Sequence, residues 1–322
     1  MKFSFLFRLL MPLLVVLQLL VAPHLACCKG LPKTEKDNAV QAQMNNVMYH
    51  FADSIAVHIQ TLTGSFVPTG TNPFPVFDDK SSFQIRIAEA RIVVRPDAIA
   101  SVLNTFVFVR KDAPLKDIAI TIENNRLKVK GKLHSKGDIP FETLGSLSTT
   151  PDGKLRLHSE KVSALHLPVK GLMDLFGIEV ADLINTNKIE GLRAEKDDLI
   201  LDLEKLLPPP HLQGAVTAVN LENNSIVTVF GVRESSSPPS PVSGNYMIFK
   251  GNQLRFGKLT MDDVDLTLLD LDPADPLDFY LDRYKDQLVP GYSKITPSFG
   301  LRAFLKDFEK VRASTKSTPQ KH

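Results

Sequence analysis

The sequence predicts an α+β fold, in which an antiparallel β-sheet packs against a few amphipathic helices. Apolar and polar residues alternate over many short stretches, a period that is typical of half-buried strands. Polar turn residues such as Asn124-Asn125 join these stretches, and turns this short connect antiparallel strands but cannot act as the crossovers between parallel strands. A few other stretches carry apolar residues at helical spacing. Hairpins combined with isolated helices are characteristic of the α+β class.

The composition restricts the kind of protein further. The 322 residues are 43% hydrophobic and 23% charged, which is sufficient for a full core in one large domain or two smaller ones. Lys and Arg number 38 and Asp and Glu number 36, so there is no strong net charge to attract nucleic acid, and none is expected as a partner. Cys27 and Cys28 are the only cysteines, which excludes a cysteine-ligated zinc site or a catalytic cysteine in the body of the chain.

Residues 1–28 resemble an export signal, because two basic residues precede an apolar stretch. Ala26 ahead of Cys27 suits cleavage, and two prolines in the apolar stretch disfavour a helix that stays in the membrane. Cys27 and Cys28 also lie where a bacterial lipoprotein signal has its lipidated cysteine, although the neighbouring residues fit that pattern poorly. We therefore expect an exported protein of the periplasm or cell envelope, with a cleaved signal, a retained helix and a lipid anchor as the open alternatives.

The chain after the signal is expected to begin with a tether, followed by strands and one helix. Residues 29–46 are polar and charged, as in a tether. Residues 49–59 and 83–94 alternate between apolar and polar side chains and are predicted to be strands. Pro96 then occupies a position suited to the first turn of a helix. The apolar face of this helix, which should pack on the sheet, consists of Ile99, Val102, Leu103 and Phe106.

Four hairpins are predicted between residues 118 and 230, each made of two alternating stretches joined by polar turn residues. Two short helices, residues 171–176 and 179–185, are expected between the second and third hairpins. Leu172, Leu175 and Phe176 are the apolar residues of the first of these helices. The hairpins cover residues 118–133, 141–165, 189–203 and 216–230.

The rest of the chain is expected to form a separate acidic region. Serine and proline dominate residues 235–243, which are predicted to be a linker. Residues 244–312 should contain a hairpin that turns at Gly251-Asn252 and, at residues 301–308, a short amphipathic C-terminal helix. Residues 313–322 are predicted to be a disordered tail.

Nine aspartates between Asp262 and Asp286 raise the question of a calcium loop. Their spacing does not follow the alternation of a calcium-binding loop, and two prolines interrupt the stretch. A solvated acidic edge is therefore the favoured interpretation.

The sequence contains no catalytic motif. A nucleophile elbow, a zinc-protease helix, a phosphate-binding loop and a dinucleotide fingerprint are all absent from it. His50 and His58 are expected on one strand and about 25 Å apart, too far to share a metal. Asp174 and Asp182 could pair by spacing, but aspartates on the wet face of a helix explain them more simply. No catalytic residue, metal or cofactor is expected, although a site assembled from distant loops would leave no motif.

The order of elements between Phe83 and Gly231 resembles that of the LmeA-like phospholipid-binding proteins of bacterial envelopes, which belong to the tubular lipid-binding (TULIP) group. A strand, the helix at Pro96, two hairpins, the short helices, the Leu207-Pro208-Pro209-Pro210 segment and a last hairpin follow one another in that order. The likeness is one of layout over nearly half the chain, and the residues before Phe83 and after Ser243 have no counterpart in it. It implies a TULIP-like domain over residues 47–234, in which a long curved antiparallel sheet wraps around amphipathic helices and leaves an apolar tunnel for acyl chains.

Three functions are compatible with these features. The first is a non-enzymatic envelope protein that binds phospholipid or another acylated molecule and meets a membrane surface. The second is a structural or assembly protein of the envelope that acts through a protein partner, and the third is a hydrolase with a site built from loops. For the first function, the predicted lipid-binding residues are Ile99, Val102, Leu103, Phe106, Leu172, Leu175 and Phe176.

Overall fold

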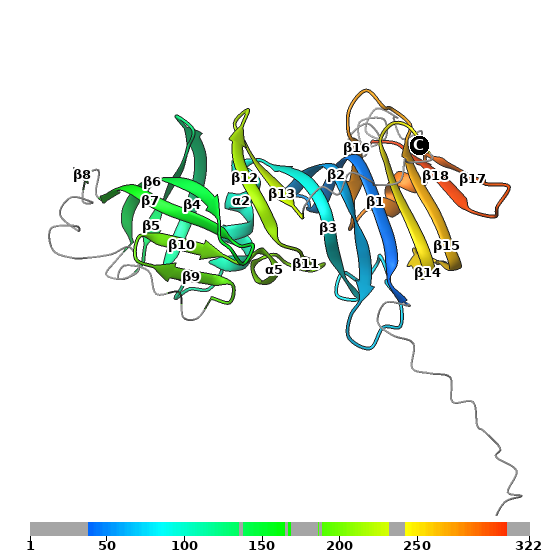
Figure 1. The fold of residues 1–322 in the computed structure, drawn as a ribbon, viewed down its shortest axis with the longest axis horizontal. Coiled ribbons are helices and arrows are strands. Elements are labelled where there is room, and N and C mark those ends of the chain that lie inside the picture. The colour runs from blue at the N-terminus through cyan, green and yellow to red at the C-terminus, as the bar shows by residue number, and fades with distance from the viewer. Residues whose placement is uncertain are drawn as a thin grey trace, which may run out of the picture. The chain divides into compact units, whose positions relative to one another are not determined.

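The computed structural model describes residues 38–134, 138–164, 167–168, 186, 189–231 and 242–307, and this part of the chain is mostly β (Figure 1). Its strands form one sheet of eleven strands and one of seven. The signal-like segment with Cys27 and Cys28, the two helices expected at 171–185 and the C-terminal tail lie outside the described residues.

The helices in the described part of the chain are short, so the predicted α+β fold with a sheet wrapped around amphipathic helices is wrong for it. A helix does begin at Pro96 as predicted, but it has only two turns before its hydrogen bonding becomes π-helical. No helix among the described residues is long and apolar enough to cross a bilayer. The helical elements are α2 (Pro96–Val102), η2 (Leu103–Val107), α5 (Leu203–Leu206) and α6 (Tyr284–Leu288).

The larger sheet has the order β12-β13-β3-β2-β1-β14-β15-β18-β17, with β11 beside β3 and β16 beside β1. Most neighbours are antiparallel, but β16 on β1, β11 on β3 and β18 on β15 are parallel. Its strands are β1 (Val40–Ala52), β2 (Ile55–Pro68), β3 (Phe83–Val94), β11 (Leu212–Gln213), β12 (Val216–Glu222), β13 (Ser225–Phe230), β14 (Tyr246–Phe256), β15 (Leu259–Asp270), β16 (Leu277–Tyr280), β17 (Tyr292–Ile295) and β18 (Leu301–Leu305).

The first two strands differ from the expectation. Residues 40–46, expected in the polar tether, belong to β1, where alternate side chains are buried between β2 and β14. The strand expected over residues 49–59 contains the turn between β1 and β2, and His58 pairs with Met48 on the neighbouring strand. The predicted separation of about 25 Å between His50 and His58 is therefore wrong, because that estimate required one continuous strand.

Residues 244–307 join the same sheet as the N-terminal strands. β14 pairs with β1, and the turn after β14 lies at Gly257, where φ is +62°, and not at Gly251-Asn252, where the strand continues. β15 lies between β14 and β18, so the aspartate-rich stretch includes an interior strand and is not a sheet edge. Residues 301–305 form β18 instead of the predicted helix, because the alternate residues Ala303 and Leu305 are buried.

The smaller sheet contains three of the four predicted hairpins, and the fourth, at 216–230, is formed by β12 and β13 of the larger sheet. Asn124 and Asn125 have φ values of +50° and +58°, as a two-residue hairpin turn requires, and they join β4 to β5. The hairpin at 141–165 is also confirmed by the pairing of β6 with β7, and the one at 189–203 by the pairing of β9 with β10. The strands are β4 (Leu115–Glu123), β5 (Arg126–Leu133), β6 (Ile139–Thr149), β7 (Leu155–Ala164), β8 (Leu167–Pro168), β9 (Leu192–Glu195) and β10 (Asp198–Leu201).

Buried residues form two hydrophobic clusters, one on each sheet. Phenylalanine rings fill the first, where Phe66 stacks on Phe83 with centroids 4.8 Å apart and Phe77 meets Phe249 edge-on at 5.3 Å. The second cluster consists mainly of Ile, Leu and Val from β4, β5 and β7. Leu201 and Val219 pack against both clusters, so the two apolar regions meet.

Candidate functional site

A cavity of about 190 Å³ lies where the two clusters meet, and residues of both sheets line it. Protein interiors seldom contain a void larger than one water molecule. For comparison, a dry apolar cavity of about 150 Å³ is large enough to bind benzene. The cavity is therefore a feature of the fold and not an ordinary packing defect.

The wall of the cavity is made of hydrocarbon. Each long strand contributes the side chains of one face, because successive residues of a strand point to opposite sides. The larger sheet supplies, among others, Ile55, Val57, Ile59 and Leu62 from β2 and Ile85, Ile87, Ile92 and Val94 from β3; the smaller sheet supplies Leu115, Ile118 and Ile120 from β4, Leu127 and Val129 from β5, and Leu199 and Leu201 from β10.

Among the described residues that line the cavity, only Tyr49 and Thr228 carry an oxygen or nitrogen in the side chain, a hydroxyl in each case. Thr228 Oγ1 already donates a hydrogen bond to the backbone oxygen of Ile92, at 3.3 Å. A buried water needs two to four polar partners, which this wall does not offer. The cavity therefore suits an apolar molecule better than water.

The structure places three of the predicted lipid-binding residues on the wall. Ile99 and Val102 of α2 and Leu103 at the start of η2 line the cavity. Phe106 does not line it, and 41% of its surface is exposed, because the change from α-helical to π-helical spacing moves it off the buried face. Leu172, Leu175 and Phe176 lie outside the described residues.

The strand residues of the wall were missed by the sequence analysis. They alternate in the same way as residues of a filled core, so periodicity predicts that they are buried but not that a space lies in front of them. A weak signal was available in the segment from Leu201 to Pro208, where five of the eight residues are apolar. Leu201, Leu203, Leu206, Leu207 and Pro208 all line the cavity.

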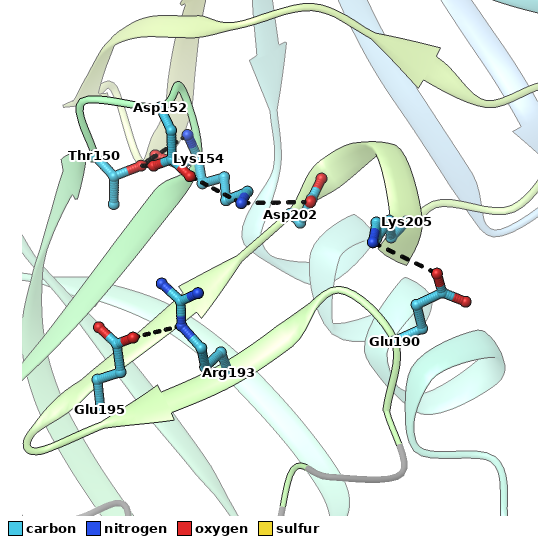
Figure 2. Close-up of polar contacts among 8 residues, drawn as sticks. All are labelled: Thr150, Asp152, Lys154, Glu190, Arg193, Glu195, Asp202 and Lys205. Carbon is cyan, nitrogen blue, oxygen red and sulfur yellow. Dashed lines mark hydrogen bonds and ion pairs between the residues drawn. The ribbon is translucent and has the colours of Figure 1, made fainter.

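Ion pairs lie on the outside of this segment (Figure 2). Asp202 lies between two lining leucines, and its Oδ2 is 3.8 Å from Lys154 Nζ, which also pairs with Asp152 at 2.8 Å. Hydrogen bonds from Lys154 and then from Thr150 lower the pKa of Asp152 to about 2. Lys205 pairs with Glu190 at 3.6 Å on the other side of α5. These charged groups neutralise one another at the surface, and none of them lines the cavity.

Neither described histidine of the first hairpin belongs to a catalytic arrangement. His50 Nε2 lies 2.6 Å from Asp278 Oδ1, and its ring stacks on Tyr280. His58 Nε2 lies 2.7 Å from Asn46 Oδ1, and burial lowers the pKa of His58. Of the lining residues that the structure describes, Tyr49 alone has an ionisable side chain, so these residues do not bring an acid, a base and a nucleophile together.

Three aspartates of the acidic stretch and its surroundings come together at the end of the larger sheet. The carboxylate oxygens of Asp270, Asp275 and Asp307 lie within 4.8 Å of one another. Burial, and then the charges of Asp307 and Asp275, raise the pKa of Asp270 against the effect of a hydrogen bond from Asn245. Acidic clusters of this kind occur without a metal, and the absence of a metal stays a prediction.

Comparison with known proteins adds no assignment. No protein-family model matches the chain, and no curated protein or solved structure is significantly similar to it.

Proposed function

We propose that the protein binds phospholipid or another acylated molecule in the apolar cavity, without catalysis. The observation that supports this most strongly is the chemistry of the wall, in which hydrocarbon side chains from both sheets surround about 190 Å³ of space. Burial of hydrocarbon contributes about 0.8 kcal/mol for each methylene, so five methylenes of an acyl chain would contribute about 4 kcal/mol. No reactive group is required for such binding.

The proposed location is outside the cytoplasm, in the periplasm or cell envelope. Its support is the export-like pattern of residues 1–28, which lie outside the described residues. In that location the protein would take its ligand from a membrane surface. The resemblance to LmeA-like proteins agrees with this function, but it rests on the order of elements alone and stays a prediction.

A cavity-filling substitution tests the proposal. Ala98 of α2 lines the cavity and is 7% exposed, so Ala98→Phe should place a ring in the space that an acyl chain would occupy. We expect the variant to remain folded, since filling a cavity usually stabilises a protein, and to lose most of its binding of an apolar fluorescent dye. Phe106→Ser is the matched control on the same helical segment, and it should bind the dye as the wild type does.

Dye binding, displacement of the dye by dodecanoyl esters, and circular dichroism would be measured together. Equal dye binding by wild type and the Ala98→Phe variant would contradict the proposal, and so would a wild-type protein that binds neither dye nor ester.

A further inference from the structure

Tyr49, one of the residues that line the cavity, has a buried hydroxyl without a hydrogen-bond partner within the described part of the chain. Tyr49 lies on β1 and is 0% exposed, and its ring packs against Phe51 and Phe279 with centroids 4.7 and 5.5 Å away. Its Oη is buried and makes no hydrogen bond. Buried tyrosine hydroxyls usually have a hydrogen-bond partner, so the hydroxyl of this lining residue is a polar group that a ligand atom could still satisfy.

The hydroxyl can act only as a neutral group. Burial, and then the charge of Asp282, raise the pKa of Tyr49, so the proton stays on Oη. The hydroxyl of Thr228, the other polar group of the wall, is already bonded to the backbone of β3. Among the described lining residues, Tyr49 is therefore the one whose side chain can still donate a hydrogen bond to a ligand.

We propose that the ligand is an acyl ester or amide whose carbonyl oxygen accepts a hydrogen bond from Tyr49 Oη. This inference rests on the proposed function and narrows its ligand class. A plain hydrocarbon would leave the hydroxyl unpaired, and a free carboxylate would bring an uncompensated charge into an apolar site. A neutral carbonyl at the end of an acyl chain would pair with the hydroxyl without bringing a charge into the site.

The test compares two probes of similar length, methyl undecanoate and dodecane, in displacement of the apolar dye. Tyr49→Phe should weaken the ester about three- to tenfold, the range expected from one hydrogen bond, and should leave dodecane unchanged. Thr228→Val is the matched control and should not change the ratio of the two affinities. An equal effect of Tyr49→Phe on both probes would contradict this inference but not the proposed function. Failure of the wild type to bind either probe would overturn the proposed function with it.

A second and independent observation concerns the hairpin of β17 and β18 at the edge of the larger sheet (Figure 1). Its tip exposes large apolar side chains, with Ile295 74% and Phe299 91% accessible. Exposed apolar patches on soluble proteins often mark a site that another protein or a membrane covers.

The turn holds Phe299 in this exposed position. The backbone N–H of Phe299 donates to the oxygen of Thr296 at 2.9 Å, and the N–H of Gly300 donates to Thr296 Oγ1 at 2.8 Å. Phe299 has a φ of +63°, a left-handed conformation that is unfavourable for a residue with a Cβ. Strained residues of this kind are concentrated at binding sites.

Aromatic and basic side chains flank the tip. Tyr292 stacks on Phe304 with centroids 4.4 Å apart, and Lys294 Nζ lies over both rings at 5.5 and 5.9 Å. Lys294 pairs in register with Arg302. Residues 287–306 contain three basic residues and no Asp or Glu. The carboxylate of Asp265 lies close to Gly300, but Lys250 is its partner at 4.0 Å.

We infer that this hairpin docks on an anionic phospholipid bilayer, with Phe299 and Ile295 in the interface and Lys294 and Arg302 at the headgroups. Aromatic rings and basic residues are the groups that anchor proteins at such surfaces. The inference does not require that the cavity holds a lipid, since it depends on the exposed hairpin alone.

Co-sedimentation with vesicles of phosphatidylcholine, with and without phosphatidylglycerol, tests the docking surface. The wild type should bind the anionic vesicles, and Phe299→Ser should weaken this binding about tenfold because it removes the aromatic ring that would enter the bilayer. Val109→Ser, which changes another exposed apolar residue of 65% accessibility, and Tyr49→Phe should both bind as the wild type does. Equal binding by the Phe299→Ser variant, no vesicle binding by the wild type, or a self-association that Phe299→Ser abolishes would each overturn the inference.

Discussion

Tyr49 and Tyr284 are both buried tyrosines of the larger sheet's core, but they differ in what their hydroxyls contact. Tyr284 Oη donates to Asp78 Oδ1 at 2.6 Å and accepts a hydrogen bond from the backbone nitrogen of Gly257 at 2.6 Å. Burial, and then the hydrogen bond to Asp78, raise the pKa of Tyr284. The hydroxyl of Tyr284 thus joins the loop at Asp78 to the turn between β14 and β15, whereas that of Tyr49 joins nothing in the described part of the chain.

The two Tyr→Phe variants should therefore differ in stability. Tyr284→Phe is expected to lower the free energy of unfolding by about 1–3 kcal/mol, because a partly buried backbone N–H loses its acceptor and Asp78 loses a donor. Tyr49→Phe removes no hydrogen bond and should leave the stability unchanged or raise it. Denaturant unfolding of the two variants without ligand measures the difference. Equal losses would mean that Tyr49 Oη has a partner in the folded protein.

At the scale of elements, the hairpins were the most predictable part of the fold. Asn124-Asn125 and Asn223-Asn224 adopt the positive φ values that their residue type tolerates, so a local signal fixed both turns. The hairpin turn predicted at Gly251-Asn252 was wrong, because β14 pairs with both β1 and β15 and continues beyond that point. The prediction of a helix at 301–308 was wrong as well. This segment has too few apolar residues to distinguish a helical period of 3.6 from a strand period of 2, and its pairing with β15 and β17 makes it a strand.

The candidate site was predictable only where it lies on a helix. Ile99, Val102 and Leu103 were selected because they share one helical face, and they line the cavity. The facing strands were not selected, because which sheet covers another depends on contacts between residues far apart in the chain. Tyr49 was not distinguished from other core aromatics for the same reason.

The ends of β15 and β18 bring Asp270 and Asp307 together with Asp275, and this cluster should make stability depend on pH. The raised pKa of Asp270 means that the folded protein favours the protonated carboxyl. Its contribution to stability is present below the ordinary aspartate pKa and is lost as the pH rises through the raised value. The wild type should therefore lose stability relative to the Asp270→Asn variant as the pH increases from about 4. Denaturant unfolding between pH 3 and pH 7 checks this, and a constant difference over that range would contradict it.

At the scale of the whole molecule, the proposed binding depends on the apolar space that the two sheets share. A sheet with one apolar face must bury it against another element, and here the described residues leave the two faces incompletely filled. Filling such a space with an acyl chain would bury hydrocarbon on both sides of the ligand. A protein without ligand would instead leave the wall without packing partners, which is unfavourable.

Native mass spectrometry of the protein isolated gently from its producing cells tests this central claim most directly. We predict that the mature chain carries an additional mass, and that denaturation releases an ester- or amide-linked acyl lipid at close to one molecule per chain. The Ala98→Phe variant, prepared in the same way, should lack that mass. A wild-type protein that shows only the mass of the bare chain, and that takes up no acyl ester when one is offered, would contradict the account.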